Sequence, residues 1–156
     1  MEFKVGQIFA TDEEKLSVAI AEAHLGLSEG GIPIGAALFD EEGRLLGSGH
    51  NLRVQEGDAS MHGETSAFRN AGRQKSYRKV TLATSLSPCW YCSGLIRQFG
   101  IGRVLVGDDQ NFKGGQDWVA EHGAEVHVMN DPGLIKLMGD FISANVALWN
   151  EDIGEE

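Results

Sequence analysis

Three short apolar segments in the second half of the chain constrain the fold most strongly. They are VTLATSL (80–86), GRVLVG (102–107) and EVHVM (125–129), and each has the composition of a β-strand. The stretches between them, from Pro88 to about Gly100 and from about Gln116 to His122, read as helices. Strands and helices that alternate in this way form βαβ crossovers, in which parallel strands are covered by helices. The second half therefore predicts the parallel part of an α/β fold.

The first half of the chain predicts a helix followed by a β-hairpin. Thr11 and Glu14 form a capping-box pattern, and apolar residues follow at helical spacing until Gly30-Gly31. The segments IGAALFD (34–40) and RLLGSGH (44–50) then read as paired strands. No repeat or flexible linker interrupts the chain, so we expect one domain over residues 1–156. The expected fold is a three-layer α/β/α sandwich around a five-stranded mixed sheet.

The charge balance argues against a nucleic-acid partner. The chain has 13 Lys and Arg against 23 Asp and Glu, a formal net charge of −10. Phosphate backbones are bound by clustered Lys and Arg. The one short basic run, RQKSYRK (73–79), reads as a solvated loop. We therefore expect a small neutral substrate.

The same composition indicates a cytoplasmic protein that does not enter the membrane. The segment MEFKVGQIFATDEEK at residues 1–15 lacks the basic and apolar regions of a signal peptide. No apolar run approaches the roughly 20 residues that a membrane helix needs. Two cysteines provide no disulfide framework, which favours a reducing compartment.

Two motifs supply candidate metal ligands. SLSPCWYC (85–92) contains the only two cysteines, Cys89 and Cys92, and MHGETSA (61–67) contains His62. Both motifs lie at the start of an expected helix, where the dipole favours a thiolate, and Pro88 suits the first turn of the second helix. Imidazole and thiolate are ligands that zinc prefers, and three protein ligands leave one coordination position open. We therefore expect one catalytic Zn²⁺ per chain.

Glu64 is the candidate general acid/base. It stands two residues after His62, so the two side chains cannot point the same way on a helix. Glu64 is thus a poor ligand but a suitable neighbour for a water whose pKa zinc lowers. The order H-x-E followed by P-C-x-x-C is typical of the zinc nucleobase deaminases.

Other interpretations of these residues remain open at this point. A C-x-x-C pair alone suits a redox disulfide, and a structural zinc site would need a fourth ligand such as His50. A zinc-stabilised interaction module without enzymatic activity is the corresponding function. That interpretation leaves Glu64 without a role.

Motifs along nearly the whole chain resemble a known family, the small zinc cytosine deaminases of the fungal type in the cytidine-deaminase-like superfamily. The motifs are EGGIPIGAAL (29–38), GHNLR (49–53), HGE (62–64), TSLSPCWYC (84–92), NFKGG (111–115) and WNEDIGE (149–155). The resemblance implies a homodimeric enzyme with zinc on His62, Cys89 and Cys92 and with Glu64 as proton shuttle. It also implies a set of substrate-binding residues: the Asn51 amide, the Gly63 N–H, the Ser87 carbonyl, the Asp152 carboxylate, and Phe112, Trp149 and Ile32 as walls around the ring.

The residues between the two cysteines depart from the fungal pattern. They are Trp90 and Tyr91, and a polar residue, Asn150, follows Trp149. Isocytosine, guanine or a creatinine-like amidine are therefore alternative substrates to cytosine. A tRNA or nucleoside deaminase is a further alternative, but a tRNA deaminase needs a basic groove that the net charge argues against.

Overall fold

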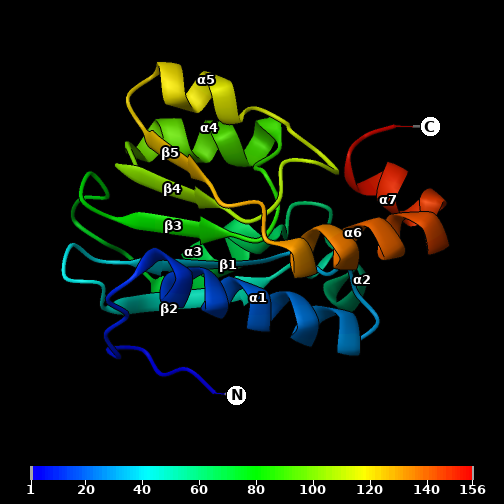
Figure 1. The fold of residues 1–156 in the computed structure, drawn as a ribbon, viewed down its shortest axis with the longest axis horizontal. Helices are drawn as coiled ribbons and strands as arrows, with labels where there is room; N and C mark the ends of the chain where they lie inside the picture. Colours follow the sequence, from blue (N-terminus) through cyan, green and yellow to red (C-terminus); the bar gives the residue numbers. More distant parts are fainter. Residues whose placement is uncertain (1, 156) are drawn as a thin grey trace.

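Five strands form one mixed sheet in the computed structural model, which describes residues 2–155 (Figure 1). The strand order is β2-β1-β3-β4-β5. β1 pairs antiparallel with both β2 and β3, whereas β3, β4 and β5 are parallel. The expected mixed sheet is confirmed, and its strands are β1 (Gly35–Phe39), β2 (Leu45–His50), β3 (Thr81–Thr84), β4 (Arg103–Val106) and β5 (Glu125–Val128).

Helices cover both faces of the sheet, as the sequence predicts. Residues of α1 and α6 pack against one face around Phe39 and Leu105. Residues of α3, α4 and α5 pack against the other face around Leu38 and Val104. The three layers are therefore helix, sheet and helix. The helices are α1 (Asp12–Ser28), α2 (Arg53–Glu56), α3 (Gly63–Ala71), α4 (Trp90–Phe99), α5 (Gln116–Glu121), α6 (Pro132–Ala144) and α7 (Val146–Asp152).

The central strands are buried on both faces, and this explains their composition. Every residue of β1 and of β3 is buried, whereas β5 at the sheet edge alternates between exposed and half-buried residues. A strand covered by helices on both sides reads as a continuous apolar run, and one with an exposed side does not.

The starts of α1 and α4 differ in detail from the expected capping. Thr11 Oγ1 accepts the Glu14 N–H at 3.1 Å, but the Glu14 carboxylate accepts the N–H of Ala10, not that of Thr11. The prediction that Pro88 lies in the first turn of a helix is wrong, because α4 begins at Trp90 with Cys89 as its N-cap. The Pro88 carbonyl instead accepts the N–H of Gly115 at 3.0 Å, which ties Pro88 to the loop before α5.

One end of the sheet gathers the segments that form the site. The N-termini of α3 and α4 meet there, and α6 and α7 pack over the same end. A separate apolar cluster joins these segments, with Ile32 and Leu86 from loops, Met138 from α6 and Trp149 from α7. Within residues 2–155, no helix has both the length and the apolar character needed to cross a membrane.

Candidate active site

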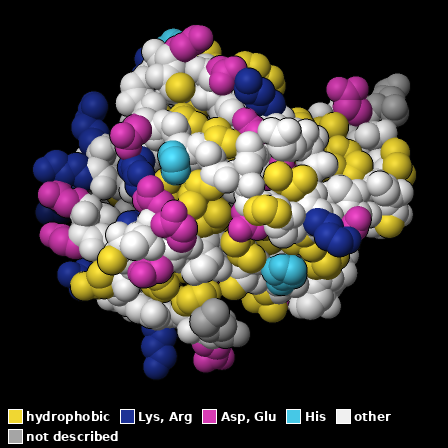
Figure 2. Space-filling view, in the orientation of Figure 1, with side chains coloured by type: hydrophobic (Ala, Val, Ile, Leu, Met, Phe, Trp, Pro, Cys, Tyr) yellow, Lys and Arg dark blue, Asp and Glu magenta, His cyan; other side chains and the backbone are white. Residues whose placement is uncertain are grey.

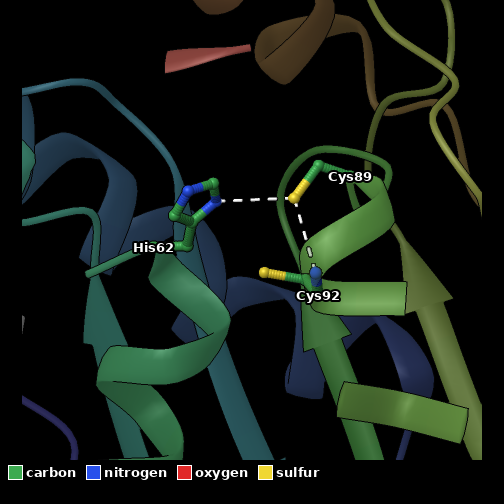
Figure 3. Close-up of side chains that lie close together, drawn as sticks. All are labelled: His62, Cys89 and Cys92. Carbon is green, nitrogen blue, oxygen red and sulfur yellow. Dashed lines mark hydrogen bonds between the residues drawn. The ribbon is translucent and has the colours of Figure 1, made fainter. Parts of the chain in front are cut away.

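His62, Cys89 and Cys92 converge at the N-termini of α3 and α4 (Figure 3). His62 is the N-cap of α3, and its N–H donates to Thr65 Oγ1 at 2.8 Å. Cys89 is the N-cap of α4, and its Sγ accepts the N–H of Cys92 at 3.4 Å. These local hydrogen bonds fix both helix starts and direct the side chains toward one another.

The spacing of the three donor atoms fits a zinc ion. One nitrogen and two sulfur atoms lie within 4.8 Å of one another, and His62 Nδ1 is 3.6 Å from Cys89 Sγ. Ligand atoms about 2.1 and 2.3 Å from a tetrahedral zinc are separated by about 3.6 Å. The donor set and its geometry therefore match a zinc site with three protein ligands.

The pKa shifts differ among the three ligand side chains: the hydrogen bond with Cys89, burial and the charge of Glu64 raise the pKa of Cys92, whereas Cys89 is shifted the other way. A hydrogen bond with Cys92 and a weaker contribution from His62 lower the pKa of Cys89 to about 4, although burial opposes them. Burial lowers the pKa of His62, but the hydrogen bond with Cys89 and the charge of Glu64 outweigh it and raise that pKa to about 9. Cys89 is thus a thiolate, the form that binds metals, and His62 releases its proton when a metal takes its place.

Glu64 lies in the first turn of α3 and is only 3% exposed. Burial is the main cause that raises the pKa of Glu64 to about 7, and the negative charge of Cys89 adds to it. A carboxyl group that titrates near neutral pH can both accept and donate a proton. The structure therefore places a candidate proton carrier beside the ligand cluster.

His50 is not available as a fourth zinc ligand. Its Nδ1 lies 2.7 Å from Glu22 and its Nε2 lies 2.7 Å from Glu29, so both ring nitrogens already have partners. Within residues 2–155 the ligand cluster consists of His62, Cys89 and Cys92. The structural zinc site that included His50 is therefore wrong.

A narrow inner cavity adjoins the ligand cluster and brings together most of the predicted site residues. Glu64 and His62 line it on one side, and Phe112 and Trp149 line it with their rings edge to face at 5.8 Å. The predicted residues that line it are His62, Glu64, Ser87, Cys89, Phe112, Trp149 and Asp152.

Asn51, Gly63 and Ile32 do not line this cavity but lie close behind its wall. Asn51 is fully buried, and its Nδ2 donates to Asp152 at 3.3 Å. Gly63 approaches the Ile34 carbonyl so closely that an added Cβ would lie 3.0 Å from it. Ile32 is fully buried in the apolar cluster that includes Trp149.

The Ser87 carbonyl oxygen accepts no hydrogen bond from any residue in the described part of the chain, so it is free to accept one from a ligand.

Sequence reasoning missed three apolar residues of the inner cavity and one charged residue beside it. The apolar residues are Ile34, Leu86 and Ile153. The charged residue is Arg53, whose Nε donates to Asp152 at 2.8 Å. GHNLR (49–53) already contains Arg53 two positions after Asn51, but no local pattern links it to a residue 99 positions away.

Trp90 and Tyr91 lie at the outer mouth of the site. They help to line a wider outer cavity of about 690 Å³ that shares His62, Cys89, Phe112 and Asp152 with the inner one. Trp90 is 66% exposed, and Tyr91 is 49% exposed and donates from its hydroxyl to the Ser60 carbonyl. Both rings therefore border the entrance and not the innermost part of the site.

The surface charge agrees with the sequence analysis. In Figure 2, Asp and Glu side chains are interspersed with Lys and Arg on the face shown. Arg73, Lys75, Arg78 and Lys79 are exposed on a loop between α3 and β3, as expected for a solvated basic run.

Comparisons with known proteins agree with this site. Residues 9–108 match the family described as "Cytidine and deoxycytidylate deaminase zinc-binding region". A protein of Candida albicans named cytosine deaminase is 45% identical over 92% of this chain and 97% of its own length. A tRNA-specific adenosine deaminase of Buchnera aphidicola is 36% identical over 62% of this chain and 65% of its own length.

Solved structures share the fold. A guanine deaminase of Nitrosomonas europaea superposes with a TM-score of 0.75 at 18% identity, covering 88% of each chain. A structure from a study of tRNA:A34 deaminases gives a TM-score of 0.72 at 21% identity, covering 80% of this chain and 99% of the other. Residues 9–108, which match the family, contain His62, Glu64, Cys89 and Cys92. This chain is a member of the zinc-dependent cytidine and deoxycytidylate deaminase family.

Proposed function

We propose that this protein deaminates free cytosine hydrolytically to uracil and releases ammonia. One observation carries the proposal: a buried carboxyl, Glu64, faces a cavity between the three-ligand cluster and the acceptor Asp152. The name of the Candida albicans relative supports cytosine as the base. His62, Cys89 and Cys92 would hold the zinc.

Glu64 carries the protons in this proposal. Zinc, when bound, acts as a Lewis acid that lowers the pKa of a water molecule to about 7. Glu64 accepts a proton from the attacking water on a carboxylate oxygen and delivers it to the ring nitrogen beside the amino-bearing carbon. It then takes the second proton from the hydroxyl group now on that carbon and passes it to the amino nitrogen. The carbon–nitrogen bond breaks, ammonia leaves, and the oxygen of the attacking water becomes the carbonyl oxygen of uracil. Its pKa of about 7 suits both directions of transfer.

Polar groups around the cavity orient the base. The Asn51 amide offers a donor and an acceptor to the amide-like edge of a pyrimidine. The Gly63 N–H, at the start of α3, donates to the ring carbonyl oxygen. The Ser87 carbonyl and the Asp152 carboxylate accept hydrogen bonds from the exocyclic amino group.

Apolar side chains hold the plane of the ring and exclude water. Phe112 and Trp149 line the inner cavity directly, and Ile32 packs behind it against Trp149. Contact of a planar base with aromatic rings contributes about 1–3 kcal/mol per base. These walls favour a flat heterocycle, but they do not distinguish one amino-substituted ring from another.

Ammonia release from a panel of substrates tests this function. The panel contains cytosine, isocytosine, guanine, adenine, cytidine, creatinine and an RNA with unpaired adenosines. We expect turnover of cytosine and none of cytidine or RNA. If another free heterocycle is turned over and cytosine is not, the deaminase activity stands and cytosine is the wrong substrate. Turnover of RNA would contradict the proposal. A protein that releases no ammonia from any of these would be a zinc-stabilised module.

We also propose that the enzyme is a cytoplasmic homodimer. The exposed Trp90 and Tyr91 next to the active-site mouth support a second copy at this edge, because large exposed aromatic side chains are typical of interfaces. The two free cysteines suit a reducing compartment. Light scattering coupled to size-exclusion chromatography should give a mass of about twice the 16.9 kDa of one chain, and a monomer would contradict the assembly.

A further inference from the structure

Arg53 connects two segments that lie far apart in the sequence. It is the first residue of α2, and its side chain is only 14% exposed. Its Nε donates to Asp152 Oδ1 of α7 at 2.8 Å. Its Nη1 lies 3.6 Å from Glu151, but that carboxylate is 60% exposed and contributes little.

The backbone of the same residue also holds the Asn51 side chain. The Arg53 N–H donates to Asn51 Oδ1 at 2.9 Å, and Asn51 Nδ2 donates to Asp152 at 3.3 Å. The three residues thus form a closed ring of hydrogen bonds. The ring fixes which side of the Asn51 amide is oxygen and leaves one acceptor and one donor site on the amide for a ligand.

Arg53 supplies the positive charge beside a carboxylate whose other hydrogen-bond donor is the neutral Asn51 amide. The Asp152 side chain is only 4% exposed, and it shares the inner cavity with Glu64. Among residues 2–155, Arg53 is the only Lys or Arg with a side-chain nitrogen within 4 Å of Asp152. A buried carboxylate without a partner is strongly unfavourable, and removal of one partner of such a pair costs more than removal of both.

We propose that Arg53 is a positioning residue that holds the Asp152 carboxylate, and with it α7, closed over the inner cavity. The inference deepens the proposed function and rests on it, because it takes Asp152 as the acceptor for the exocyclic amino group. An ionised Asp152 has only acceptor oxygens and therefore requires a hydrogen-bond donor on the ligand. The substrate presents an amino group at that ring carbon, whereas the product presents a carbonyl oxygen. Arg53 thereby favours binding of the substrate over binding of the product.

A set of substitutions tests this role, with Arg69→Gln as the matched control. Arg69 lies on α3 and pairs with Glu56 at the surface, so its replacement changes the net charge equally without touching Asp152. We expect Arg53→Gln to raise the KM for cytosine at least tenfold, with a smaller change in kcat, and to weaken discrimination against uracil. Arg53→Lys should recover part of the loss, and Arg69→Gln should leave both constants unchanged.

A double-mutant cycle shows whether Arg53 acts through Asp152. If it does, Arg53→Gln combined with Asp152→Asn should be no worse than Asp152→Asn alone. Additive losses in the double variant would overturn the proposal. If Arg53→Gln folds poorly, Arg53→Lys takes its place in the cycle. Arg53→Lys should then raise KM when Asp152 is present and should have no further effect when it is combined with Asp152→Asn.

Hydrogen exchange of the zinc-loaded protein tests, independently of turnover, whether Arg53 holds α7 closed over the inner cavity. The amides of residues 146–155 should exchange at least tenfold faster in Arg53→Gln than in wild type or Arg69→Gln. An unchanged exchange rate in this segment would overturn the proposal that Arg53 holds α7 closed. If wild type releases no ammonia from cytosine but the exchange result holds, the proposed substrate fails while the closure of α7 by Arg53 stands.

Discussion

The ligand cluster and the cap over it are held in place by very different means. His62 and Cys89 are the N-caps of helices whose inner faces, at Ala67 and Ile96, are almost completely buried against the sheet. The cap consists of α7, a seven-residue helix whose N-cap Asn145 makes no side-chain capping bond. Its polar attachment to the rest of the site passes through Asp152.

This difference separates metal binding from substrate binding. Helices that are packed across the sheet hold their first turns rigidly, which suits a metal site that must keep its geometry. The short helix α7 packs on loops and on α6 and not on the sheet, so it opens more easily than α3 or α4. Segments of low local stability are those that admit ligands and release products. Damage to the ligand cluster should therefore remove zinc, whereas damage to the cap should lower turnover and leave zinc bound.

Loss of a ligand should have the largest effect. Cys92→Ala removes a fully buried sulfur, so we expect zinc content near zero, no detectable turnover and a melting temperature lower by about 10 °C. Metal analysis measures the zinc content, ammonia release measures turnover, and calorimetry measures the melting temperature. A chelator should lower the melting temperature of wild type by a similar amount and leave that of Cys92→Ala unchanged. Retention of one zinc per chain in the variant would break the distinction between cluster and cap.

Removal of the second half of the cap should lower turnover strongly but leave metal binding intact. A chain that lacks residues 149–156 loses Trp149 and Asp152, and we expect turnover to fall about 100-fold or more because the base is no longer held in place. Zinc content should stay at one per chain. Full activity of the shortened chain would mean that α7 does not close the pocket.

A smaller effect is expected from the wall of the inner cavity. Phe112→Ala removes one of the two rings that meet edge to face, and we expect KM for cytosine to rise about tenfold with zinc content unchanged. The matched control is Phe99→Ala, at the far end of α4, where the ring packs against Phe68 and Tyr77. Equal effects of the two substitutions on KM would contradict a role of Phe112 in binding the base.

The smallest effect should be a pH-dependent change in stability at His50. The hydrogen bond with Glu22 and then that with Glu29 raise the pKa of His50, although burial opposes them. A raised pKa in the folded state contributes stability below the unfolded value of about 6.5, and this contribution is lost as pH rises through the folded value. His50→Gln should therefore cost about 2 kcal/mol at pH 6 and less at pH 9.

Urea unfolding across this pH range measures the difference between His50→Gln and wild type. The control is His24→Gln, which replaces an exposed histidine on the same helix that carries Glu22. A difference at His50 that stays constant from pH 6 to pH 9 would mean that the charged imidazolium does not stabilise the fold.

The contrast between cluster and cap also explains what could be predicted from sequence. Cys89 and Cys92 are three positions apart and His62 opens the next predicted helix upstream, so local patterns were sufficient to place them at helix starts and hence together. The layers followed from strands such as 80–86 that are buried on both faces. Pro88 was placed two residues too far into the helix, because the Cys89 side chain, which is an unusual N-cap, supplies the capping bond.

The cap was beyond such reasoning. Asn145 separates α6 from α7 and belongs to a residue type that favours N-caps, but it makes no side-chain capping bond. WNEDIGE has no helical apolar spacing and reads as an irregular tail, although its first four residues are the second half of α7. The Asp152–Arg53 pair joins residues 99 positions apart, and charge pairs of this separation leave no periodic signal. Only the resemblance to a known family pointed to Asp152, and nothing in the sequence pointed to Arg53.

The most direct test compares wild type with Glu64→Gln at equal zinc content. Each protein, loaded with one zinc per chain, is incubated with cytosine while uracil and ammonia are measured together. We predict equal amounts of the two products from wild type and a rate lower by about 10³-fold or more in Glu64→Gln, because the amide cannot carry the protons. A Glu64→Gln protein that binds zinc normally and releases ammonia at the wild-type rate would contradict the account.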